Sequence, residues 1–264
     1  MATTRSISKG AAKPAAKAAP RLSLAEVMKT LEQAGSEQTR KTYRRHGAQD
    51  PMFGVSFATM KTLVKRIGVD HDLAFALWDT GNHDARMLAI KIADAARMRP
   101  AEIDQWTHAS RPGPCGGYVA MLAAEGPHGA AKAREWLASP DAIMRAAGWT
   151  LAGHLATMDA TNDDDWFAEL LSRIETTIHS ASNAERGAMN QAMIVIGGRS
   201  PSLRKAATAT ATRVGTVYVD HGDTACKTPD AAAYIEKTWA HAAAKKFESP
   251  AAQERAREPM RIRC

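Results

Sequence analysis

The chain has 264 residues, of which 45% are hydrophobic and 24% carry a formal charge, a composition typical of a soluble protein with one large core or a stack of repeats. No apolar run approaches the length of a membrane span, and three scattered cysteines without a CxxC motif exclude a disulfide framework and a zinc ribbon. We therefore expect a cytoplasmic protein without membrane association.

The net charge of +7 is concentrated at the two ends of the chain. Residues 1–21 contribute +5 without an acidic side chain, and residues 245–264 contribute +3, which leaves the body close to neutral. The first segment has few large apolar side chains and predicts a disordered basic arm. We expect a single domain over residues 22–244, followed by a basic, solvated C-terminal tail over residues 245–264. Any anion-binding groove must come from local clustering of cations.

Apolar side chains recur at helical spacing along most of the body. The expected helices, in chain order, cover residues 22–34, 57–67, 70–78, 82–97, 118–124, 130–137, 141–156, 166–179, 184–196, 203–214 and 229–246. Asn183 is expected to cap the helix at 184–196. Lys61 and Lys65 share one face of the helix at 57–67. Residues 102–108 predict only a turn or two, and SRPGPCGG at 110–117 cannot be an intact helix. Residues 216–228 begin like a strand but are too isolated to form a sheet.

Two stretches repeat one helix-turn-helix unit. FALWDTGNHDARMLAIKIA at 75–93 and REWLASPDAIMRAAGWTLAGH at 134–154 each end a helix on a Trp and start the next one after a polar break. The break is expected to supply the N-cap, which is Asn82 in the first copy. The matching positions are Trp78 with Trp136, Asn82 with Ser139, Asp84 with Asp141, and Arg86 with Arg145. A repeated unit among about a dozen paired helices predicts an all-α solenoid, whose concave surface suits an extended partner.

The second helix of the second copy has two distinct faces. We expect Ser139 to cap it and Pro140 to occupy its first position. Arg145 and Trp149 lie on one face, where they either meet a ligand or, respectively, cap a carbonyl and pack against the next repeat. The other face is predicted to be a buried stripe of apolar side chains at every fourth position, Ile143, Ala147, Leu151 and Leu155.

Three stretches carry a resemblance to a known family: YRRHGAQDPMFGVSFATMKTLVKRI at 43–67, HDLAFALWDTGNHDARMLA at 71–89 and EWLASPDAIMRAAGW at 135–149. In order over residues 38–215, the chain resembles the DNA alkylation repair glycosylases of the AlkD type. The resemblance implies a right-handed, C-shaped α-solenoid of HEAT-like helix pairs with a basic concave channel for duplex DNA. It also implies hydrolysis of the N-glycosidic bond of cationic N3- or N7-alkylated purines, without a metal, nucleotide or other cofactor.

The chain departs from that family at the catalytic positions. The family carries a Trp and, four residues later, an Asp where Pro112 and Gly116 align, and a further family Trp falls near Val195. Arg145 matches the DNA-contacting Arg of the family, within MRAAG. The candidate DNA-binding residues are therefore Arg145, Trp149, Arg86, Lys61 and Lys65. No catalytic carboxylate is identified, and the remaining candidates are Asp104, Glu125, Asp220 and Asp223.

Residues 220–226 place Asp220, His221, Asp223 and Cys226 close together. No standard zinc spacing is met, so a hydrogen-bonded turn is favoured and no metal site is expected. Three functions stay open: a glycosylase acting on alkylated purines, a catalytically silent DNA-binding member, and a helical scaffold that binds a protein. We expect a monomer whose partner is duplex DNA.

Overall fold

The computed structural model describes residues 21–110, 115–159 and 163–263. Across these ranges the chain is helical, with two short 3-10 turns and no β-strand, which confirms the all-α class. No helix in these ranges has the length and apolar character needed to cross a membrane. The α-helices are α1 (Leu24–Gln33), α2 (Glu37–Arg45), α3 (Phe57–Ile67), α4 (His71–Asp79), α5 (His83–Ile92), α6 (Pro100–Ala109), α7 (Cys115–Glu125), α8 (Gly129–Leu137), α9 (Ala142–Met158), α10 (Asp164–Thr177), α11 (Asn183–Gly197), α12 (Pro201–Val214), α13 (Ala231–Ala244) and α14 (Pro250–Arg255). The 3-10 turns are η1 (Ala95–Arg97) and η2 (Ile178–Ser180).

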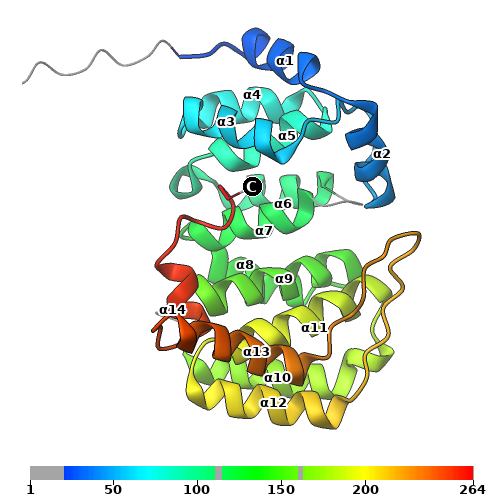
Figure 1. Ribbon diagram of the computed structural model, residues 1–264, viewed down its shortest axis with the longest axis vertical. Coiled ribbons are helices and arrows are strands. Elements are labelled where there is room, and N and C mark those ends of the chain that lie inside the picture. The colour runs from blue at the N-terminus through cyan, green and yellow to red at the C-terminus, as the bar shows by residue number, and fades with distance from the viewer. Residues whose placement is uncertain (1–20, 111–114, 160–162, 264) are drawn as a thin grey trace, which may run out of the picture.

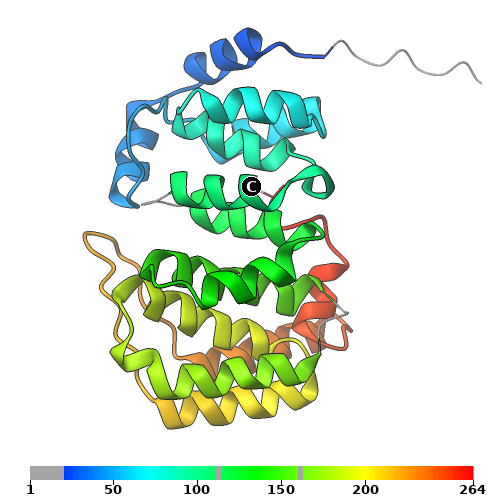
Figure 2. The ribbon, with the colours of Figure 1, turned by 180° about the vertical axis from the view of Figure 1, so that it is seen from behind.

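The helices are stacked in pairs along the long axis of the molecule, as both views show (Figures 1 and 2). The pairs α4–α5, α6–α7 and α8–α9 pack internally, and α10 and α11 continue the series. The second helices form a continuous layer, because α5 contacts α7, α7 contacts α9, and α9 contacts α11. Each pair can bury its apolar face only against its neighbours, which is the physical basis of a repeat stack.

Most helices begin at a residue whose side chain accepts a backbone N–H from the first turn. Asn82 was predicted as such a cap and is confirmed. The cap of α9 is Asp141, which accepts from the Ile143 N–H, whereas the predicted cap, Ser139, accepts from the Asp141 N–H two residues earlier. That prediction was wrong because two capping residues compete there, and the carboxylate is favoured at the positive end of a helix.

Two further boundaries differ from the sequence-based expectation. Ser182, not Asn183, caps α11, because the Asn183 side chain is bonded in both directions to the backbone of Asp220. The turn expected at 102–108 is the ten-residue helix α6, which starts with Pro100 at its first position and has Glu102 bonded back to the Arg99 backbone N–H.

The buried core follows the stack and is rich in tryptophan. Trp78 and Trp106 are stacked with ring centroids 4.1 Å apart, and Trp136 and Trp149 are fully buried further along. The stripe predicted for α9 is only half correct, because Leu151 and Leu155 are buried but Ile143 is 44% exposed and Ala147 is half-buried. The helix is enclosed by α7 and α8 on one side and by α11 on the other, so apolar side chains on several of its faces are buried.

The loop between α2 and α3 is fixed to the stack by one carboxylate. Asp84 is 0% exposed, and its side chain accepts the backbone N–H groups of Phe53, Gly54 and Val55 at 2.7, 2.9 and 2.8 Å. Gly54 has a φ of 80°, and a Cβ there would lie 2.5 Å from the Ser36 carbonyl oxygen, so only glycine fits. The carboxylate thus satisfies three backbone donors that would otherwise be orphaned.

The segment from residue 250 to 263, here called the C-terminal strap, packs back across the stack (Figure 1). Arg261 is 4% exposed and donates to the carbonyls of Ile90, Lys91 and Ala93 at the end of α5. Lys91 is 1% exposed and donates to the carbonyl of Arg261 at 2.7 Å. The solvated tail predicted for this end of the chain is therefore wrong over these residues, because their charges serve as donors for helix-end carbonyls.

Candidate nucleic-acid interface

The first turns of the second helices lie along one edge of the stack. His83 Nδ1 at the start of α5 lies 3.7 Å from Cys115 Sγ at the start of α7, and Arg145 near the start of α9 is paired with Glu185 near the start of α11. We call these first turns, with the connections at 80–82, 138–141 and 181–182, the connection edge. Helix N-termini carry partial positive charge, so this edge favours anions.

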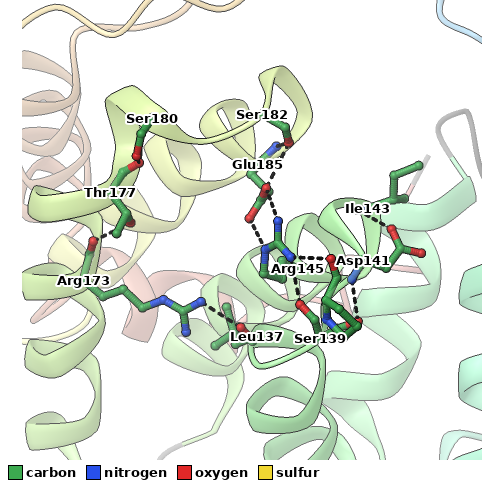
Figure 3. A network of polar contacts seen from close by, with 11 residues as sticks. Leu137, Ser139, Asp141, Ile143, Arg145, Arg173, Thr177, Ser180, Ser182 and Glu185 are labelled. Atoms are coloured by element: carbon green, nitrogen blue, oxygen red, sulfur yellow. Dashed lines mark hydrogen bonds and ion pairs between the residues drawn. The ribbon is translucent and has the colours of Figure 1, made fainter.

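Arg145 is held by four described contacts (Figure 3). Its Nε and Nη2 donate to the two oxygens of Glu185 at 2.6 and 3.0 Å, and its Nη1 donates to the carbonyls of Ser139 and Pro140 at 2.9 and 2.8 Å. The prediction that Arg145 could cap a carbonyl is confirmed. The side chain remains 26% exposed, so part of the guanidinium faces solvent at the connection edge.

Glu185 is the carboxylate beside Arg145, and the sequence reasoning missed it. It is the third residue of α11, and its Oε2 accepts from the Ser182 hydroxyl at 3.0 Å. Burial alone would raise the pKa of Glu185, but hydrogen bonds from Arg145 and Ser182 outweigh it and lower the pKa below its usual range. The S-x-x-E spacing from Ser182 is a capping-box signal that would have placed Glu185 at this helix start.

We expect Glu185→Gln to lower the melting temperature by about 5 °C at neutral pH, since it leaves Arg145 without its counter-charge, a loss of about 2 kcal/mol. When the pKa of a carboxyl is lowered in the folded state, the ion pair stabilises the protein fully above the unfolded-state pKa, about 4.3. This stabilisation is lost as the pH falls through the folded-state pKa. The difference between wild type and variant should therefore be constant from pH 8 to about pH 5 and vanish in stronger acid.

Thermal unfolding measured between pH 3 and pH 8 tests this expectation. Glu175→Gln is a matched control, because Glu175 pairs with Arg213 but keeps 32% of its side chain exposed, and we expect no measurable change in melting temperature. A Glu185→Gln difference that persists unchanged at pH 3 would contradict the ion pair as its cause.

Trp149 is 0% exposed, so its indole offers no surface for contact with a base. This agrees with packing against the neighbouring repeat and not with the DNA-binding role predicted for the ring. Its Nε1 has no hydrogen-bond partner among the described residues, and the guanidinium carbon of Arg173 lies 5.3 Å from the ring centroid. Arg173 comes from α10 and donates to the Leu137 carbonyl at 2.8 Å. No sequence signal pointed to Arg173, because its position on α10 matches neither copy of the repeat.

Arg86 occupies the position in α5 that Arg145 occupies in α9, as the repeat predicted. Its Nε donates to the Trp78 carbonyl and its Nη1 to the Ala109 carbonyl, both at 3.3 Å, and its guanidinium lies 5.0 Å from the Trp78 ring centroid. Both arginines therefore cap the end of the preceding helix or its connection. Lys61 is half-buried and Lys65 is exposed on α3, and no contact among the described residues joins them to Arg86 or Arg145.

The carboxylates considered for catalysis are engaged in other ways. Asp104 accepts from Trp136 Nε1 at 2.8 Å and from Lys132 at 2.6 Å, and Glu125 is paired with Arg261 of the C-terminal strap at 2.8 Å. Asp220 accepts the Gly222 N–H at 2.8 Å, as in the predicted turn, and Asp223 lies exposed beside it. None of the four contacts Arg145 in the described structure.

A second group of cations lies at α2. Arg40 and Arg44 share the acids Glu37 and Asp50, whereas Lys41 and Arg45 are exposed. The extended segment 216–228 reaches toward α2, as both views show (Figures 1 and 2). A pocket of about 370 Å³ lies between them, lined by Arg45, His46, Thr224, Ala225 and Cys226.

Residues 27–235 match the family model described as DNA alkylation repair enzyme. The chain belongs to the DNA alkylation repair enzyme family. Two uncharacterized Listeria proteins, Lin0241 of Listeria innocua and Lmo0209 of Listeria monocytogenes, are each 27% identical to it over 214 residues, which is 78% of this chain and 93% of theirs.

A solved structure is also similar, with a TM-score of 0.75 and 28% identity over 83% of this chain and 95% of its own. It is described as a new family of proteins related to the HEAT-like repeat DNA glycosylases with affinity for branched DNA structures. The HEAT-like repeat fold expected for this DNA alkylation repair family member is therefore confirmed. Gly116 lies in the first turn of α7 and has no side chain to supply the family carboxylate, while Pro112 lies outside the described residues.

Proposed function

We propose that this chain binds DNA at the connection edge and does not excise alkylated bases. The observation that carries the proposal is the arrangement of Arg145 at a row of helix N-termini in a chain of the DNA alkylation repair enzyme family. Exposed Lys41 and Arg45 on α2 add cations without acidic partners among the described contacts. Such groups neutralise phosphates without reading the base sequence.

The positions of the carboxylates support the proposal that alkylated bases are not excised. Loss of an alkylated base builds positive charge on the sugar, and a free carboxylate or aromatic face must stabilise that charge. Glu185 is close to Arg145, but both of its oxygens accept hydrogen bonds from Arg145 and Ser182. Trp149 is covered. The connection edge therefore supports binding better than catalysis.

The proposal includes branched DNA as well as linear duplex. The similar solved structure is described as having affinity for branched DNA structures. In the present chain, cationic α2 and segment 216–228 approach each other and can contact different parts of one bound DNA. A junction presents more phosphates within that span than a single duplex does.

We expect a mobility shift at 50 mM salt with a linear duplex, a three-way junction and a four-way junction, with affinity falling steeply as salt rises. The double variant Lys41→Gln/Arg45→Gln should weaken binding about tenfold through lost phosphate contacts. Lys205→Gln on α12 is the control and should bind as wild type does. No shift with any of these DNAs at low salt would refute the proposed function.

A separate assay tests the proposal that the protein does not excise alkylated bases. A duplex containing 7-methylguanine is incubated with the protein, and released base is measured by chromatography. We expect no release above the level seen without protein. Release that Glu185→Gln abolishes would instead assign a glycosylase activity with Glu185 as the carboxylate.

A further inference from the structure

A pocket of about 300 Å³ opens at the connection edge between α9, α10 and α11. Figure 3 shows its two guanidinium groups, with Arg173 from α10 directed at the Leu137 carbonyl and Arg145 from α9 directed at Glu185 and the Ser139 carbonyl. Residues important to its lining are Ala142, Arg145, Trp149, Arg173, Ser182 and Glu185.

The charges in this pocket do not balance. Glu185 neutralises Arg145, with both carboxylate oxygens directed to that guanidinium. Arg173 has no carboxylate within ion-pair distance among the described residues, although its side chain is half-buried. It uses one N–H for the Leu137 carbonyl, so most of its donors are left for another acceptor. A partly desolvated guanidinium without a counter-charge is costly, and an anion would offset that cost.

Two further features add positive potential. Ala142 is the first residue of α9 and Ser182 is the cap of α11, so the positive ends of two helices border the pocket. Beneath Arg173, Trp149 is 0% exposed, and its Nε1–H donor has no acceptor in the part of the chain that the structure describes. Buried donors are normally paired, so this orphan N–H leaves an uncompensated dipole in a residue that lines the pocket.

We infer that this pocket binds one phosphate group, with Arg173 as its counter-cation and the Arg145–Glu185 pair as a fixed wall. The planar guanidinium matches the oxygens of a phosphate with two parallel hydrogen bonds. The assignment to a phosphate of DNA rests on the proposed function. The same chemistry fits an internal phosphodiester and a terminal 5′-monophosphate, and the experiments distinguish these sources.

The first experiment uses the protein without DNA. Thermal unfolding is measured in sodium phosphate and in sodium chloride at equal ionic strength, for wild type and Arg173→Gln. We expect phosphate to raise the wild-type melting temperature by about 3 °C, by binding only the folded state, and to leave the variant unchanged. Comparing each protein with itself removes any loss of stability caused by the substitution.

Arg204→Gln is the matched control. Arg204 also lies over an indole, 4.9 Å from the Trp239 ring centroid, but it is paired with Glu236 and lies on α12 away from this pocket. The phosphate effect should be the same in this variant as in wild type. An equal rise in Arg173→Gln and wild type, or no rise in wild type, would overturn the inference whether or not the protein binds DNA.

The second experiment measures DNA affinity against salt. Arg173→Gln should weaken binding about tenfold, and the slope of log K against log salt should become shallower by about 0.9, the value for one phosphate contact. If a 5′-phosphorylated duplex binds wild type more tightly and the variant loses only that increment, the group is a terminal monophosphate. If Arg173→Gln binds the duplexes with and without a 5′-phosphate more weakly by the same factor, the bound group is an internal phosphodiester. If the protein binds DNA but Arg173→Gln leaves the salt slope unchanged, the phosphate pocket is contradicted while the proposed DNA binding stands.

Discussion

Replacing Arg261 by alanine is expected to lower the free energy of unfolding by about 3–5 kcal/mol, the range for breaking a buried charge pair. Arg261 is 4% exposed, and its removal leaves Glu125 without a partner and the Ile90, Lys91 and Ala93 carbonyls without a donor. The melting temperature should fall by about 10 °C. Urea and thermal unfolding followed by circular dichroism measure both quantities.

Arg257→Ala provides the comparison for this prediction. Arg257 belongs to the same strap and is paired with Glu254, but its side chain is 52% exposed. We expect a change below about 1 kcal/mol, the usual worth of a surface pair. Equal effects of the two substitutions would show that the strap does not stabilise the stack through the contacts of Arg261.

The second large effect is expected for Asp84→Ala, which should cost about 4 kcal/mol, because each backbone donor bonded to a charged group contributes about 1.5–3 kcal/mol and the losses overlap. Three N–H groups, the buried ones of Gly54 and Val55 and the partly buried one of Phe53, lose their acceptor at once. The loop between α2 and α3 should then detach, and its amide protons should exchange with solvent far faster than in wild type.

Asp70→Asn separates this role from ordinary helix capping. Asp70 caps α4 and accepts only the Leu73 N–H among the described contacts, and asparagine is an equally good cap. The free energy of unfolding of Asp70→Asn should stay within about 0.5 kcal/mol of the wild-type value. Normal exchange of the residue 53–55 amides in Asp84→Ala would rule out the proposed role of the carboxylate.

The helices were predictable because their causes are local. The spacing of apolar residues predicted most of the helices, and Asn82 predicted the start of α5. The role of Asp84 was not predictable in the same way. The sequence showed an acid in a first turn, where the helix dipole favours it, but not that a loop 30 residues earlier would bring three N–H groups to its side chain.

The candidate site was predictable only in part for the same reason. The repeat correctly paired Arg86 with Arg145, since both cap preceding carbonyls. It could not show that Glu185, 40 residues later, would fix Arg145, or that Arg173 would cover Trp149. Those contacts join different helix pairs, and their geometry is set by how the pairs stack.

The strap also changes how this fold can come apart. In a row of helix pairs that contact only their neighbours, unfolding can begin at either end and travel inward one pair at a time. Here the bond from Lys91 to the Arg261 carbonyl joins positions 170 residues apart, so the C-terminal strap is bonded to the end of α5. Fraying from the C-terminal side must therefore disrupt the end of α5 simultaneously, and the two regions should show one shared opening energy in native-state hydrogen exchange.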